Sequence, residues 1–170
     1  MPLDASFAGR CYPPSRVYEV SREKIREFAD AIGDPDPVFR DVAAARAAGH
    51  PDVIAPPTFA VVVTMPAQAV LVQDPDLGLD YTKVVHREQS FRRHRPIVAG
   101  DRLVTTVHVD GIRSAAGNDI LTTRSEVSTE GGEQVLTAMA VIVARGTASP
   151  AAGAAGTARA AGTAGASEVV

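Results

Sequence analysis

Several features that mark particular classes of protein are scarce in this 170-residue chain. A single cysteine, Cys11, excludes a disulfide within the chain and favours a reducing, cytoplasmic location. A formal net charge of only −3 gives no reason to expect nucleic acid or an acidic membrane surface as the main partner. The opening MPLDASFAGR lacks the apolar core of a signal peptide. These absences predict a cytoplasmic protein with one full-sized core.

Charged residues are missing from one long stretch, VIAPPTFAVVVTMPAQAVLV, residues 53–72. Twenty such residues could span a bilayer. Prolines, threonines and a glutamine interrupt the stretch, however, and no basic flank follows it. We therefore predict a buried central helix from Thr58 to Val72, kinked or ended early by Pro66 and surrounded by other structure.

Large apolar residues are almost missing from the end of the chain. From Gly146 onward the sequence consists mainly of Ala, Gly, Ser and Thr, which cannot form a packed core. The sequence thus predicts one folded domain in residues 1–145 and a disordered tail in residues 146–170.

The remaining pattern predicts an α+β fold. A short strand at residues 16–20 is followed by a helix with Ser21 as its cap, whose buried face is formed by Ile25, Phe28, Ala29 and Ile32. Prolines in GDPDP end this helix. After residue 80, four runs rich in Val, Ile and Thr alternate with turns, which is typical of long antiparallel strands. An antiparallel sheet curled around the central helix accounts for this order.

Three stretches carry a family resemblance: IREFADAIGDPDP, APPTF and HREQSFRRHRPIVAGD. With the order of elements, they resemble the hot-dog fold of MaoC-like (R)-specific enoyl hydratases and dehydratases. The resemblance is strongest to the N-terminal dehydratase-like branch, which includes the A subunits of heterodimeric (3R)-hydroxyacyl-ACP dehydratases. It covers nearly all of the folded part and implies a hot-dog fold.

The loop GDPDPVFRD, residues 33–41, departs from the family pattern at one position. The resemblance implies an aspartate at Asp34 and a histidine five residues later, which together position water and move a proton. Phe39 replaces that histidine, and a phenyl ring cannot exchange protons. Without the resemblance, the loop is simply a turn rich in Asp and Pro. The resemblance instead implies that Asp34 is a remnant of a catalytic pair.

Four histidines could substitute for the missing one: His50, His86, His94 and His108. Each is explained more simply as structural or as a surface residue. His50 is the best alternative, because its loop leads into the central helix. We find no spacing typical of a metal site, and we expect no metal and no cofactor.

Two further stretches are candidate substrate contacts. Pro57, Thr58 and Phe59 begin the central helix, where free N–H groups can polarise a thioester carbonyl, although a plain helix start explains them equally well. Arg92, Arg93 and Arg95 could contact the phosphates of coenzyme A or an acyl carrier protein, or form an ordinary solvated strand end.

These observations lead to one functional prediction with two alternatives. The resemblance implies that the chain binds an acyl-CoA or acyl-ACP thioester and pairs with a hot-dog subunit that carries an intact Asp-x4-His. The first alternative is a self-sufficient homodimeric hydratase or thioesterase that uses Asp34 or His50. The second is a non-catalytic protein that binds acyl thioesters.

Overall fold

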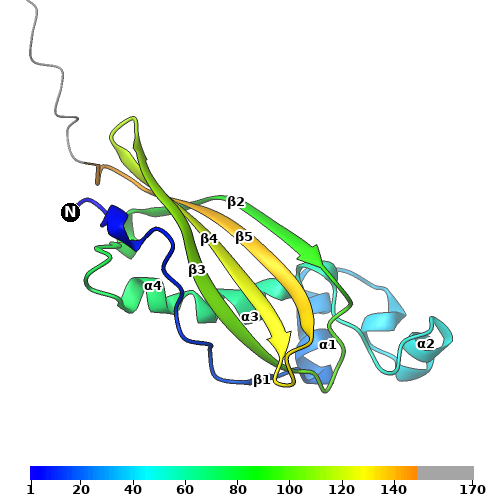
Figure 1. Ribbon diagram of the computed structural model, residues 1–170. Helices are drawn as coiled ribbons and strands as arrows, with labels where there is room; N and C mark the ends of the chain where they lie inside the picture. Colours follow the sequence, from blue (N-terminus) through cyan, green and yellow to red (C-terminus); the bar gives the residue numbers. More distant parts are fainter. Residues whose placement is uncertain (149–170) are drawn as a thin grey trace, which may run out of the picture.

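The computed structural model describes residues 1–148 of the chain (Figure 1). Its helices and strands are η1 (Ala5–Phe7), β1 (Tyr18–Glu19), α1 (Arg22–Ala31), η2 (Pro37–Phe39), α2 (Val42–Ala47), η3 (Pro57–Phe59), α3 (Ala60–Ala67), α4 (Ala69–Gln73), η4 (Tyr81–Lys83), β2 (Val84–Arg93), β3 (Arg102–Ala115), β4 (Asn118–Thr129) and β5 (Gln134–Ala144).

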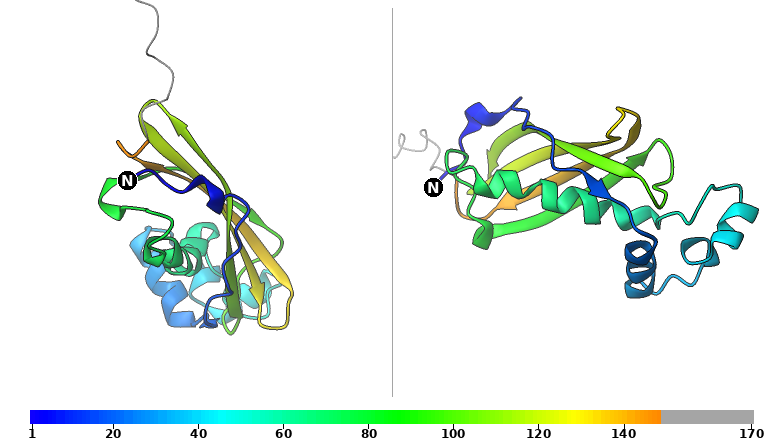
Figure 2. Two further views of the ribbon diagram at one scale, coloured as in Figure 1. Left: turned by 60° about the vertical axis from the view of Figure 1, so that its left-hand side comes forward. Right: turned by 90° about the horizontal axis from the view of Figure 1, so that it is seen from below.

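The five strands form one antiparallel sheet in the order β1-β3-β4-β5-β2. The sheet curls around α3 and α4, which lie against its concave face, and α1 and α2 lie beside one end of it (Figures 1 and 2). This arrangement confirms the predicted α+β fold of the hot-dog type. The four runs rich in Val, Ile and Thr are the four long strands. Buried residues alternate with more exposed ones along β3, β4 and β5, whereas β2 is exposed over most of its length.

The core between helix and sheet consists of two apolar clusters. The first contains Phe59 and Leu103 and lies toward α1. The second contains Leu71 and Val107 and lies toward α4. Since Leu103 and Val107 sit on the same face of β3, the two clusters follow one another along the strand.

The start of α1 matches the sequence pattern. The Ser21 side chain accepts a hydrogen bond from the backbone N–H of Lys24, and Glu23 lies in the first turn. Ile25 and Ala29 face the core as predicted, but Ile32 does not: it is the C-cap residue and is 48% exposed. The helix ends there, so the helical spacing no longer directs its side chain inward.

Ser21→Ala is expected to lower the free energy of unfolding by about 1 kcal/mol, since the cap satisfies an otherwise unpaired N–H group. Ser21→Asp keeps an acceptor at the same place and is the matched control. Urea denaturation of both variants measures the effect. Equal stability of Ser21→Ala and wild type would contradict the capping role.

The central helix breaks where proline predicts. Pro66 lies inside α3, which ends at Ala67, and α4 continues the path after Gln68. The prediction that other structure surrounds this helix is wrong on one side. Met65 and Val72 are 49% and 41% exposed, because within a single chain the sheet covers only the opposite face.

The two edges of the sheet differ. On the β3 side, the N-terminal strap (residues 1–17) runs along the strand: Gly9 donates its N–H to the Val109 carbonyl at 2.8 Å and Tyr12 to Val107 at 2.9 Å. On the other side, β2 pairs with β5 alone among the described residues, and most of its residues are exposed. The β2 edge is thus open for pairing with another strand.

The end of the described chain still packs against the domain, since the buried Thr147 donates a hydrogen bond to Asp119 at 2.8 Å. The predicted disordered tail lies outside the described residues from 149 onward. Within residues 1–148, no helix is both long and apolar enough to cross a membrane.

Candidate functional site

The loop that follows α1 is built by local hydrogen bonds. The Asp34 carboxylate accepts the N–H of Asp36 at 3.1 Å, and the Asp36 carboxylate accepts the N–H of Val38 at 3.0 Å. Both are turns in which a side chain replaces a backbone acceptor. Asp34 is partly buried at the α1 end of the molecule, where Pro37–Phe39 forms η2 (Figure 1).

Phe39 does not line this loop's surface. Its side chain is 6% exposed and belongs to the apolar cluster that also contains Ile25 and Phe59. Phe39 therefore contributes packing to the core, and its correspondence to the family histidine remains a prediction.

The start of the central helix lies near the same end. Phe59 is fully buried, whereas Pro57 and Thr58 are exposed at the first turn. No side chain within the described residues caps this start. The geometry suits the binding of a carbonyl oxygen, and this role remains a prediction.

Arg95 is used by the fold. Its guanidinium contacts Asp101 at 2.8 and 3.0 Å, Glu133 at 3.0 and 3.2 Å, and the Pro96 carbonyl at 2.8 Å. The hydrogen bonds that Arg95 donates to the Asp101 carboxylate are the main cause that raises the Arg95 pKa further above its ordinary value. All five N–H donors are engaged, so Arg95 has no donor left for a phosphate. Arg92 and Arg93 are exposed near the end of β2.

The histidines lie in separate places. His50 borders a hollow that Arg95 and Asp101 also line. His108 lies on the outer face of the sheet, 3.4 Å from Glu126. His94 is exposed just after β2, and His86 lies on β2 itself.

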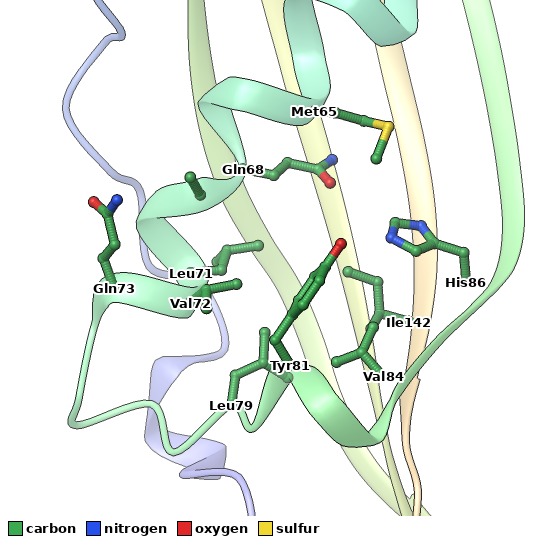
Figure 3. A pocket seen from close by; sticks show the side chains of 11 residues that line it. Met65, Gln68, Leu71, Val72, Gln73, Leu79, Tyr81, Val84, His86 and Ile142 are labelled. Carbon is green, nitrogen blue, oxygen red and sulfur yellow. The ribbon is translucent and has the colours of Figure 1, made fainter.

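A pocket that the sequence did not reveal lies at the α4 end of the central helix (Figure 3). It has a volume of about 240 Å³. Its walls come from three segments of the chain: Met65–Gln73, Leu79–His86 and Ile142. Of the candidate residues named in the sequence analysis, His86 alone lines it. The pocket and the Asp34 loop lie at opposite ends of α3 and α4, and these fourteen residues span about 21 Å.

The pocket is mostly apolar, with three polar groups that converge. Figure 3 shows the Tyr81 hydroxyl and the His86 ring pointing into the space beside the Gln68 amide. Gln68 is 8% exposed and donates a hydrogen bond to Ser125 at 3.3 Å. An apolar cavity with a few placed polar groups is typical of a site for a small organic ligand. In the sequence, only the presence of His86 could have indicated this pocket. The alternation of residues along β2 does not show which side chains the His86 ring faces.

The described residues contain no group of three or more His, Cys, Asp or Glu side chains that could hold a metal ion. The lining of the pocket suits an apolar chain with a polar group, and the start of the central helix offers N–H groups for a carbonyl oxygen. Fold and loop together define a dehydratase-type hot-dog protein.

Comparison with known proteins assigns the family. The family described as "FAS1-like, dehydratase domain region" matches residues 6–138, and the chain belongs to it. A UPF0336 protein of Saccharopolyspora erythraea is 64% identical over 148 residues, which is 87% of this chain and 95% of that protein.

Solved structures agree with this family. A MaoC-like dehydratase is 34% identical with a TM-score of 0.76 over 82% of this chain, which spans only 42% of that longer chain. The C-terminally truncated HadBC (3R-hydroxyacyl-ACP dehydratase) complex from Mycobacterium tuberculosis has a chain that is 29% identical, with a TM-score of 0.72. The match covers 81% of this chain and 96% of that one. These likenesses confirm the predicted MaoC-like family.

Proposed function

We propose that this chain is the substrate-binding subunit of a (3R)-hydroxyacyl-thioester dehydratase or enoyl hydratase of fatty-acid metabolism. A second hot-dog subunit with an intact Asp-x4-His supplies the acid–base chemistry. The observation that carries the proposal is Phe39, which stands in place of the histidine and is buried in the core. A chain that keeps the fold but carries a buried phenyl ring where the family pattern has its proton-transfer group suits binding rather than catalysis at the Asp34 loop.

Exposed apolar surface supports a partner. Met65, Val72, Tyr81 and Val85 are each more than 40% exposed, and they lie on the central helix and around β2. The β2 edge is unpaired among the described residues, and a strand of a second subunit can continue the sheet there. The HadBC chain is part of a complex by its description, which favours the same kind of pairing.

The proposed reaction divides the work between two subunits. Hydration forms a C–O bond at C3 of the enoyl chain and places a proton on C2, and dehydration reverses both changes. The partner's aspartate and histidine orient the water and transfer the proton. This chain holds the acyl group in its apolar pocket, which orients the thioester and keeps bulk water away.

The test compares this chain alone, the partner alone and the co-purified pair in the hydration of trans-2-octenoyl-CoA. The pair is expected to turn over at least about 10²-fold faster than this chain alone, because a positioned acid–base group contributes that much. Asp34→Asn and His50→Asn in this chain leave the rate of the pair unchanged. Turnover by this chain alone that is lost in Asp34→Asn or His50→Asn would refute the proposal.

A further inference from the structure

A polar seam crosses the core beneath the central helix. It consists of Gln68 on the helix side, Thr105 on β3, and Thr123 and Ser125 on β4, all of which are buried. On β3, Thr105 lies between the two apolar clusters described above. Thr123 and Ser125 share the concave face of β4, since alternate residues of a strand face the same side.

The polar seam destabilises the folded chain, because packing does not replace the hydrogen bonds that its hydroxyl groups make with water in the unfolded chain. The hydroxyl groups of Thr105 and Thr123 are buried and have no hydrogen-bond partner within the described structure. A buried polar group without a partner destabilises a protein by about 1–3 kcal/mol, and valine has nearly the same shape. Neither threonine lines the pocket at the α4 end of the central helix, whereas Gln68 of the seam does.

Gln68 connects the seam to the pocket at the α4 end of the central helix. Its amide donates to Ser125 on the seam side and also lines the pocket. A side-chain amide has two N–H donors and an oxygen acceptor, so one hydrogen bond leaves most of its capacity for a ligand. In Figure 3, Tyr81 and His86 present a hydroxyl and an imidazole to the same space.

The rest of the pocket is apolar and of limited size. Met65, Leu71, Val72 and Ile142 are among its walls. The volume of the pocket is about 240 Å³. A plain alkyl chain in this space would leave the amide of Gln68 facing methylene groups.

We infer that this pocket selects acyl thioesters whose chain carries a hydroxyl or carbonyl oxygen near its far end, in preference to plain alkyl chains. The inference rests on the proposed function, because it names the acyl class that the binding subunit holds. The oxygen pairs with Gln68, Tyr81 and His86, and the methylenes pack against the apolar walls. A site built to hydrogen-bond an oxygen disfavours an analogue without it, since its own polar groups then lose their partners.

The test is calorimetric titration of the full chain, alone and in the complex with its catalytic partner, with 8-hydroxyoctanoyl-CoA and octanoyl-CoA. We expect the hydroxylated probe to bind about tenfold more tightly, the change that one net hydrogen bond gives. Gln68→Leu should abolish this preference. Gln73→Leu is the matched control, because Gln73 points away from Tyr81 and His86 in Figure 3, and it should keep the preference.

Tyr81→Phe removes only a hydroxyl from a 57% exposed residue, so it tests the pocket without disturbing the core, and it should reduce the preference. Equal binding of both probes by wild type, or a preference that survives Gln68→Leu, would overturn the inference and leave the proposed function standing. If neither probe bound to the chain alone or to the complex, both the inference and the proposed function would be overturned.

Discussion

Phe39→Ala is expected to lower the free energy of unfolding by about 3–5 kcal/mol, the usual cost of removing a buried phenyl ring. The ring is 6% exposed and packs in the cluster with Ile25 and Phe59, so its removal leaves a cavity at the α1 end of the core. Urea denaturation monitored by circular dichroism measures the change.

Asp34→Asn is the matched control in the same loop. Its carboxylate accepts one local hydrogen bond, from Asp36, and the amide oxygen of asparagine can accept the same bond. Stability should therefore change by less than about 0.5 kcal/mol. If Phe39→Ala were as mild as Asp34→Asn, the ring would not support the core, and the case for a structural residue at the histidine position would fail.

The second large effect is expected at Asp119, a carboxylate that is 1% exposed and joins distant parts of the chain. It accepts the N–H of Leu3 at 3.0 Å and the hydroxyls of Ser114 at 2.5 Å and Thr147 at 2.8 Å. In Asp119→Asn the amide oxygen can still accept from Leu3 and Thr147, but these bonds lose the charged acceptor, and the Ser114 hydroxyl faces an N–H donor in place of an oxygen. A loss of about 2 kcal/mol is expected near neutral pH.

The pH dependence of this effect has a definite sign. Burial by itself raises the pKa of Asp119, but the hydrogen bonds from Ser114, Leu3 and Thr147 outweigh it and hold the pKa below the ordinary 3.8. The unfolded chain then binds the proton first on acidification. The stability contributed by the charged form is complete above pH 3.8 and is lost as pH falls through the folded pKa.

Denaturation at several pH values distinguishes the contribution of Asp119 from the general loss of stability in acid. The difference between wild type and Asp119→Asn should shrink on acidification below pH 3.8. Asp110→Asn is the control, because its ion pair with Arg124 is partly exposed and contributes less than about 1 kcal/mol. A difference for Asp119→Asn that grew on acidification would contradict the assignment.

Features that depend on neighbours in sequence could be predicted from the residues alone. The cap at Ser21 and the end of the central helix near Pro66 rest on local backbone chemistry, which hardly depends on the rest of the molecule. The long strands follow from alternation, and the family follows from the order of elements with its motifs. Ile32 was misplaced because helical spacing was extended one residue past the end of the helix.

Side-chain surroundings could not be predicted in this way. The sequence presents Arg95 as one of a basic group, and only the fold places Asp101 and Glu133 around it. The sequence analysis interpreted His86 as a structural or surface residue. In the fold, its ring points into the pocket beside Gln68. These contacts join segments far apart in the chain, and periodicity carries no information about which segments meet.

The sequence by itself thus determined the hot-dog fold and the family. The tertiary structure alone decided that the Phe39 ring fills the core and that the pocket lies at the other end of the central helix. The reason is physical. Secondary structure follows local sterics and periodicity, whereas a pocket exists only where the packing of distant segments leaves a space between them.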